Sequence, residues 1–209
     1  MTVWFKNVVA PNRRFLDGWR PIQGQFLNAV DDPANAAIQV FLLRCPDRQV
    51  GKTVLMLNLL NRECVRCGGI TGLYVAPTYQ IARQVGWEGP DGLLAWLPAI
   101  PFLRVDHRAM MVSYPNGSTL RVVGCGYVED VARGYGFTVT ALDQAELMPE
   151  SIWRRWLLPG LLASPGSRAF IVYDPDVDSW VAQVTSEMPF VIVCWPEMGT
   201  TRSIVHGPA

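Results

Sequence analysis

Short apolar runs alternate with longer amphipathic stretches along most of the chain. Each run is five to seven residues long and rich in Val, Ile, Leu and Phe, which is typical of strands buried on both faces of a parallel sheet. The stretches between the runs have the composition of helices. This alternation predicts an α/β fold with a mostly parallel central sheet flanked by helices on both faces. The predicted strands are 38–43, 70–76, 137–142, 169–173 and 190–194, and the main helices are 53–66, 79–87 and 152–162.

Two further runs, 110–114 and 119–123, are separated by only four residues, PNGS. Asn116-Gly117 between two β-rich runs predicts a hairpin, because both residues accept the backbone conformation of a tight turn. Glycines over 124–136 predict a flexible loop after it. Pro159-Gly160 predicts an interruption of the last main helix.

Domain organisation follows from where this alternation starts and stops. The first 37 residues are rich in Pro, Asn, Arg and Trp, with one short helix predicted over 23–30. The last residues have few apolar side chains and are expected to fray. We therefore predict a lead-in over 1–37, one α/β core over 38–196 and a tail over 197–209, which suits a chain of 209 residues.

Composition and charge exclude several classes of protein. Half of the residues are hydrophobic, so a sizeable core can form and a disordered chain is excluded. The 18 basic and 18 acidic side chains give zero net charge, which excludes a generally basic nucleic-acid binder. No run of 18 apolar residues and no signal-peptide core is present, so we expect a soluble intracellular protein without membrane spans.

Five cysteines are an odd number in a chain with no export signal, which favours free thiols. Cys64 and Cys67 form a lone CxxC pair. Structural zinc needs a second pair of ligands, and the only histidines, His107 and His206, lack ligand-like spacing. We therefore interpret the pair as structural.

The sequence PDRQVGKT between a predicted strand and a predicted helix carries the strongest chemical signal. It fits the phosphate-binding pattern GxxxxGK[ST], with Pro46 in place of the first glycine. Gly51 lets the backbone approach phosphates, Lys52 neutralises the β- and γ-phosphates, and the Thr53 hydroxyl is a magnesium ligand. The remaining predicted ATP-binding residues of this loop are Asp47, Arg48, Gln49 and Val50.

A phosphate loop of this kind needs an acidic residue at the end of a buried strand to hold magnesium. The run FTVTALD supplies Asp143. ATPases of the strand-catalytic-glutamate class (ASCE) place a water-activating glutamate directly after that aspartate, where this chain has Gln144. Glutamine can hold water but cannot accept its proton, so it is a poor general base. Glu146, two residues further on, is the alternative catalytic carboxylate.

Taken together, these motifs resemble the ATPase domain of the large terminase subunit, the DNA-packaging motor of tailed bacteriophages. The stretches that carry the resemblance are DRQVGKT, YVAPTYQIARQVGWE, the hairpin-to-strand run ending FTVTALDQAE, and WRPIQGQFL. They extend from about Trp19 to Asp176. The resemblance implies a P-loop NTPase of the RecA-like ASCE type that uses ATP and Mg²⁺.

The family also implies individual roles. Gln23 corresponds to the glutamine that reads adenine, and Arg48 to an arginine that contacts the γ-phosphate and acts as a cis arginine finger. Arg133 is a second candidate for sensing nucleotide or a neighbouring subunit. Tyr79 and Gln80 lie where related translocases approach DNA. Tryptophans at helical spacing are expected to pack in the core.

The implied function is an ATP-driven motor that moves double-stranded DNA into a capsid. The implied partners are double-stranded DNA, a portal protein, a small terminase subunit and further copies of the chain in a ring, in the cytoplasm of the host cell. No nuclease domain is expected, because only Glu187 and Glu197 follow Asp178, too few carboxylates for two metals.

Three departures keep other readings open. Gln144 replaces the catalytic glutamate, Asp174-Pro175 stands where the coupling motif usually has Ser or Thr before Pro, and the sequence stops where a nuclease domain would begin. These features fit an engineered chain and equally a divergent or split terminase. The alternatives are a catalytically weak ATP-binding scaffold or regulatory module, and another DNA-dependent P-loop translocase.

Overall fold

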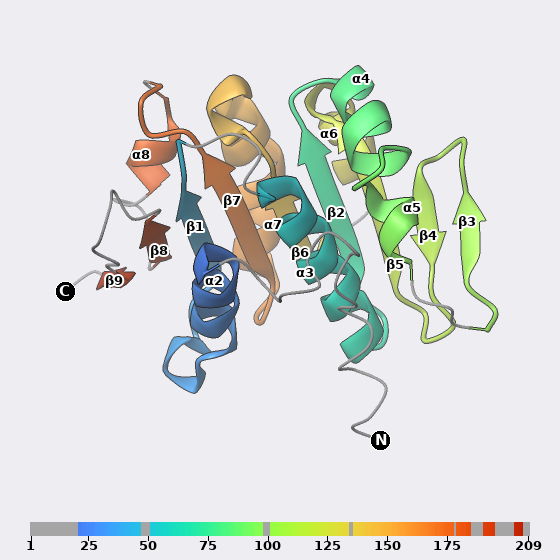
Figure 1. Ribbon diagram of the computed structural model, residues 1–209, viewed down its shortest axis with the longest axis horizontal. Coiled ribbons are helices and arrows are strands. Elements are labelled where there is room, and N and C mark those ends of the chain that lie inside the picture. The colour runs from blue at the N-terminus through green and yellow to red at the C-terminus, as the bar shows by residue number, and fades with distance from the viewer. Residues whose placement is uncertain are drawn as a thin grey trace.

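The strands of this chain form one mixed sheet (Figure 1). The computed structural model describes residues 21–46, 51–97, 101–133, 136–177, 179–184, 190–194 and 203–206. Within these residues the strand order is β3-β4-β5-β2-β6-β7-β1-β8-β9. The strands are β1 (Val40–Arg44), β2 (Thr71–Ala76), β3 (Arg104–Asp106), β4 (Met111–Ser113), β5 (Thr119–Gly124), β6 (Val139–Leu142), β7 (Arg168–Tyr173), β8 (Phe190–Cys194) and β9 (Ser203–His206).

Parallel pairing runs from β5 through β2, β6, β7 and β1 to β8, and antiparallel strands flank it. The predicted buried strands and the predicted hairpin, β4–β5, are therefore confirmed. β3 was not predicted, because all three of its residues are exposed and carry no apolar alternation. β9 lies in the expected tail and pairs with β8, so this part of the tail extends the sheet instead of fraying.

The helices also follow the predicted order. The longest, α3, covers residues predicted as helical, and the stretch after β2 forms α4 followed by a π-helix, η3. The Pro159-Gly160 step does not interrupt the last helical stretch. Pro159 lies in the first turn of α7, where a missing backbone N–H costs nothing. The bounds are α2 (Pro21–Asp31), α3 (Lys52–Arg66), α4 (Tyr79–Ile81), η3 (Ala82–Trp87), α5 (Leu93–Trp96), α6 (Val128–Ala132), η6 (Ile152–Leu157), α7 (Leu158–Ala163) and α8 (Val181–Val184), with short 3₁₀ turns η2 (Pro33–Asn35), η4 (Cys125–Tyr127) and η5 (Ala145–Leu147).

Helices cover both faces of the sheet, as Figure 1 shows. Alternate residues of β1 separate into two buried clusters, with Phe41 and Leu43 in one and Val40 and Leu42 in the other. The first cluster includes side chains of α2 and α3, and the second includes side chains of α6, η6 and α7. The predicted arrangement of a sheet between two helical layers is thus confirmed. None of the described helices is long and apolar enough to cross a membrane.

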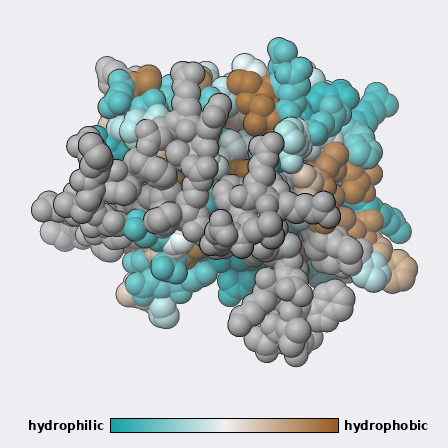
Figure 2. Space-filling view, in the orientation of Figure 1, coloured by the Kyte–Doolittle hydropathy of each residue, from teal (hydrophilic) through white to brown (hydrophobic). Residues whose placement is uncertain are grey.

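The free edge at β3 is protected by charge. Arg104, Val105 and Asp106 are all exposed, and the nearby Phe102 is 86% exposed. Charged side chains on an edge strand oppose pairing with a second sheet. Figure 2 shows that the described surface on this face is mainly hydrophilic, with apolar side chains gathered toward the side of α5 and β4.

The strand order decides where chemistry can occur. β7 lies between β1, which precedes the phosphate-loop sequence, and β6, which precedes Asp143. Because these strands are parallel, their carboxyl ends meet at the same edge of the sheet. Ligands of open α/β sheets bind outside that edge.

The end of β5 packs against the turn that follows β2, and only glycine fits there. A Cβ on Gly124 would lie 2.3 Å from the backbone nitrogen of Tyr79 and 2.6 Å from the carbonyl carbon of Thr78. We expect Gly124→Ala to destabilise the protein by about 1–3 kcal/mol, because the backbone must move. Thermal unfolding measures this, with Gly126→Ala as the matched control, since nothing lies within 4 Å of a Cβ at that position. Equal melting temperatures for the two variants would contradict the packing described.

Candidate active site

The phosphate-loop residues lie at the start of α3, as the sequence predicted. Gly51 is the N-cap, with φ 84° and ψ 27°, a left-handed conformation that glycine adopts without strain. It has no side chain to cap the helix, so the first backbone N–H groups of α3 have no side-chain acceptor at the N-cap. An uncapped N-terminus of a 15-residue helix is suited to binding phosphate.

Lys52 and Thr53 both reach across this edge of the sheet. The Lys52 ammonium donates to the carbonyl of Cys45 just beyond β1, with Nζ and O 2.8 Å apart. The Thr53 hydroxyl donates to Asp143 at the end of β6, with Oγ1 and Oδ2 2.5 Å apart. Residues 90 positions apart in the sequence are thereby brought into direct contact.

Asp143 is 3% exposed and accepts a second hydrogen bond on the same oxygen, from the Tyr74 hydroxyl at 2.7 Å. Its other oxygen, Oδ1, is buried and has no hydrogen-bond partner among the described residues. Burial raises the pKa of Asp143, whereas the hydroxyls of Thr53 and Tyr74 and the charge of Lys52 lower it. A buried carboxylate oxygen without a partner, beside a threonine hydroxyl, fits a hard cation such as Mg²⁺.

The residues after Asp143 have two different environments. Gln144 is half-buried in a left-handed conformation, with φ 60° and ψ 52°, and it begins the 3₁₀ turn η5. Glu146, on that turn, accepts a backbone hydrogen bond from Asp174. Its Oε2 atom is buried without a partner in the described part of the chain. Burial raises the pKa of Glu146, and the nearby Lys52 charge opposes that rise.

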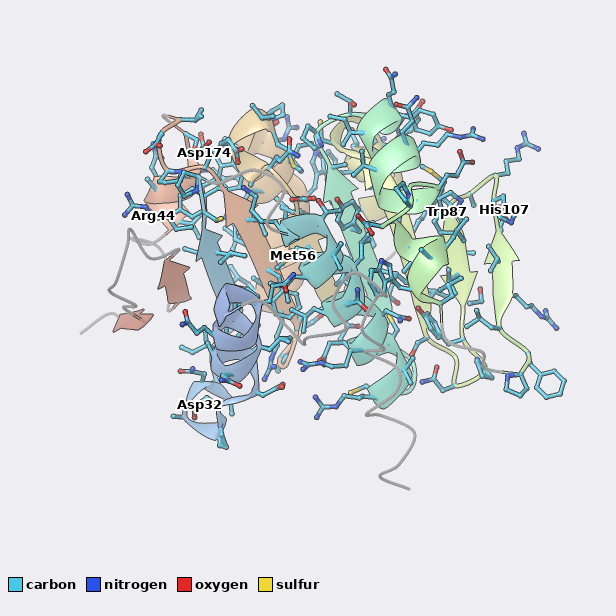
Figure 3. The ribbon with its side chains drawn as sticks, in the orientation of Figure 1. Asp32, Arg44, Met56, Trp87, His107 and Asp174 are labelled. Atoms are coloured by element: carbon cyan, nitrogen blue, oxygen red, sulfur yellow. The ribbon has the colours of Figure 1, made fainter. Side chains whose placement is uncertain are left out.

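Asp174 therefore lies beside Glu146 at the carboxyl end of β7. Figure 3 shows Asp174 and Arg44 at neighbouring strand ends, while Trp87 and His107 lie toward the other side of the molecule. The position that departs from the family's coupling motif is thus in contact with a candidate catalytic carboxylate, a link that the sequence did not predict.

Gln23 lies on α2 and is 1% exposed. Its side-chain amide donates to the carbonyl of Gly51, with Nε2 and O 3.0 Å apart. The structure thus brings Gln23 to the end of the phosphate loop, 28 residues away in sequence. Its role in reading adenine stays a prediction. Asp47, Arg48, Gln49 and Val50 lie outside the described residues, so their predicted contacts with ATP stay predictions as well.

Arg133 is engaged at the surface, at the C-terminal end of α6. Its side chain is 67% exposed, forms an ion pair with Glu129, and lies over the ring of Trp156 with 5.6 Å between the guanidinium carbon and the ring centroid. The ion pair was the alternative to a sensing role, which stays a prediction.

Tyr79 is half-exposed and is therefore not a core residue. Its ring packs against that of Tyr127 with centroids 5.7 Å apart. Gln80 is exposed as well. The expected packing role of the tryptophans is confirmed for Trp87 and Trp153, which are fully buried.

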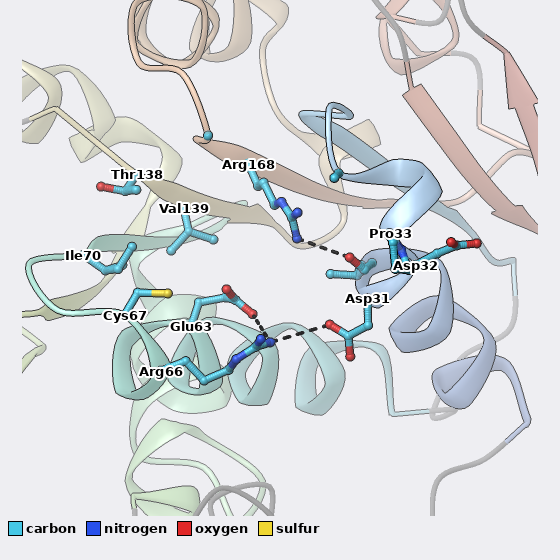
Figure 4. A pocket seen from close by; sticks show the side chains of 13 residues that line it. Asp31, Asp32, Pro33, Glu63, Arg66, Cys67, Ile70, Thr138, Val139 and Arg168 are labelled. Atoms are coloured by element: carbon cyan, nitrogen blue, oxygen red, sulfur yellow. Dashed lines mark hydrogen bonds and ion pairs between the residues drawn. The ribbon is translucent and has the colours of Figure 1, made fainter. Parts of the chain in front are cut away.

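A separate cavity of about 350 Å³ lies among the ends of α2 and α3 and the starts of β6 and β7 (Figure 4). Its charged groups are largely paired, since Arg66 lies 3.7 Å from Asp31 and 3.8 Å from Glu63. Cys67 of the CxxC pair lines it and is exposed, whereas Cys64 is buried with its thiol 3.6 Å from the Thr119 carbonyl. Burial raises the pKa of Cys64 to about 12, as expected for a thiol with a packing role.

Tyr74 is the site residue that sequence reasoning missed. It lies inside an apolar strand, ITGLYVA, where tyrosine is an ordinary core residue. The available signal was its polar tip in a strand otherwise buried. Only the pairing of Tyr74 with Ala141 shows that its hydroxyl reaches the aspartate two residues further along β6.

Comparison with solved structures places this fold among phage motor domains. The large terminase ATPase domain of Thermus phage P74-26 matches with a TM-score of 0.61 and 20% identity, over 94% of this chain and 82% of that one. The large terminase of another thermophilic bacteriophage, in complex with ATP-γ-S, matches with a TM-score of 0.55 and 11% identity, over 74% of this chain and 38% of that one.

The same large terminase in complex with ADP gives a TM-score of 0.54 at 17% identity, over 73% of this chain and 38% of that one. No protein-family model and no curated protein matches the sequence. The chain therefore has the RecA-like fold of large terminase ATPase domains, as the motifs predicted.

Proposed function

We propose that this chain binds Mg-ATP and hydrolyses it as the motor domain of a DNA-packaging terminase. The observation that carries the proposal is the hydrogen bond between Thr53 and Asp143, which joins the phosphate-loop helix to the acidic strand end. It occurs in a fold shared with large terminase ATPase domains, one of which has been solved with ATP-γ-S and with ADP.

The proposed roles follow from the geometry. The N-terminus of α3 binds phosphate oxygens, and the Lys52 ammonium leaves the Cys45 carbonyl to neutralise the β- and γ-phosphates. Thr53 and Asp143 hold Mg²⁺, which would neutralise charge that develops on the phosphate oxygens. Arg48 contacts the γ-phosphate, and Gln23 positions the loop end and reads adenine.

Glu146 is the better-supported candidate for accepting the proton of the attacking water. Its buried, unpartnered Oε2 and its raised pKa suit a general base, and the Asp174 backbone holds the carboxylate. Gln144 orients water at most. In this arrangement the base lies two residues beyond the position that the ASCE pattern predicts.

The proposed physiological work is movement of double-stranded DNA into a viral capsid in the host cytoplasm. The partners are a portal protein, a small terminase subunit and further copies of the chain in a ring, in which Arg133 of one copy senses nucleotide or its neighbour. The exposed pair Tyr79 and Tyr127 offers stacking surface on the same side as Gln80.

Gln144 favours one alternative, an ATP-binding scaffold or regulatory module with little hydrolysis. Another DNA-dependent P-loop translocase is the second alternative. The three readings differ in what stimulates phosphate release, so one assay separates them.

We expect the purified chain to bind Mg-ATP in calorimetry and to release phosphate faster when linear double-stranded DNA is added. DNA binding should be weak and fall steeply with salt, because a chain without net charge contacts phosphates through a few local arginines. Single-stranded DNA is the matched control. Stronger stimulation by single strands would favour another translocase, and tight ATP binding without hydrolysis on any DNA would favour the silent module.

A further inference from the structure

The hydroxyl of Tyr74 is committed to the magnesium carboxylate. It donates to Oδ2 of Asp143 at 2.7 Å, the oxygen that also accepts from Thr53 at 2.5 Å. Two donors on one oxygen fix the rotation of the carboxyl group. The remaining oxygen, Oδ1, is left buried and without a partner among the described residues.

The tyrosine ring is itself held in place. Tyr74 is fully buried on the α3 side of the sheet, between β5 and β6. Gly86 of the π-helix η3 packs directly on it, since a Cβ at that glycine would lie 2.8 Å from Cε1 of the ring. A ring clamped between a sheet and a helix presents its hydroxyl at one position.

From this geometry we propose that Tyr74 is a positioning residue for the magnesium site. By occupying Oδ2 together with Thr53, it aims Oδ1 of Asp143 at the cation. The inference rests on the proposed function, because it presumes that a cation-bound nucleotide occupies this edge of the sheet. It assigns no proton transfer and no contact with nucleotide to Tyr74.

A purely structural role predicts something different. Loss of a buried hydroxyl weakens any fold, but it does not change how strongly a cation supports nucleotide binding. Hydrogen-bond partners of metal ligands typically contribute about 10- to 100-fold to metal affinity. The dependence of nucleotide affinity on magnesium therefore distinguishes the two roles.

The experiment measures the affinity for ATP-γ-S by calorimetry, once with excess Mg²⁺ and once with EDTA. Magnesium should strengthen binding to the unmodified chain. In Tyr74→Phe we expect this strengthening to shrink about tenfold, while the affinity in EDTA stays unchanged. The matched control is Tyr114→Phe, which loses an equally buried hydroxyl that donates to Asn61 at 2.6 Å, remote from the site.

The control should lower the melting temperature without changing the magnesium effect. If Tyr74→Phe keeps the full magnesium effect, or loses affinity equally with and without magnesium, Tyr74 does not position the site. If the unmodified chain binds no nucleotide under either condition, the proposed function itself fails.

A second variant keeps the test independent of Tyr74→Phe. Gly86→Ala retains the hydroxyl but presses on the ring, so it should displace the donor and reduce the magnesium effect in the same direction. An unchanged magnesium effect in folded Gly86→Ala, with the ring displaced in its structure, would overturn the proposal.

Discussion

Replacing Lys52 with alanine is expected to abolish measurable ATP binding while the protein stays folded. The ammonium is the cation placed to reach the β- and γ-phosphates from the start of α3. Each charge-assisted hydrogen bond contributes about 1.5–3 kcal/mol, so losing two weakens binding about 10²- to 10⁴-fold. The fold should tolerate the change, because a positive charge at a helix N-terminus opposes the helix dipole.

Calorimetric titration with Mg-ATP checks this result, and circular dichroism checks the fold. Arg66→Ala is the matched control: it removes one positive charge from the other end of the same helix, where the side chain is 49% exposed. That variant should bind ATP normally. Unchanged affinity in Lys52→Ala would refute the assignment of the nucleotide site.

Replacing Glu146 with glutamine is expected to lower ATP turnover about 10²- to 10⁴-fold, the usual contribution of a general base. ATP affinity should change little, because the carboxylate acts as charge develops in the transition state and not in the bound ground state. The fold should tolerate the substitution, since a neutral amide is easier to bury than a carboxylate. Steady-state phosphate release over a range of ATP concentrations separates the two effects.

Gln144→Glu, alone and together with Glu146→Gln, completes the design. If Glu146 is the base, the glutamate at position 144 adds little to turnover. Should Gln144→Glu instead raise turnover by the same order, with Glu146→Gln silent, the base position is the one that the ASCE pattern predicts. Glu150→Gln serves as the control, because it makes the same substitution in an exposed ion pair with Arg154.

Both experiments depend on how the strands are ordered. The motifs alone predict a lysine near phosphate and an aspartate near magnesium. They do not state that β7 separates β1 from β6, or that Thr53 and Asp143 share a hydrogen bond. Strand order follows from how helices on both faces pack, which is a property of the whole chain and not of any segment.

Local patterns by themselves determined the elements and the site motifs. Continuous apolar runs can be buried only as central strands, Asn116-Gly117 favours one tight turn, and glycine before Lys52 permits the left-handed start of α3. These constraints act within a few residues, so they are legible without coordinates. They predicted the parallel sheet, the hairpin and the position of the phosphate-loop helix, all of which the structure confirms.

Tertiary structure alone decided which side chains meet. The pairing of β2 with β6 carries the Tyr74 hydroxyl to Asp143, and the pairing of β6 with β7 leaves Glu146 beside Asp174. An apolar strand with one tyrosine, and a glutamate two residues beyond an expected position, look ordinary in sequence. Their roles arise from contacts across neighbouring strands, and register between strands depends on packing that no local pattern encodes.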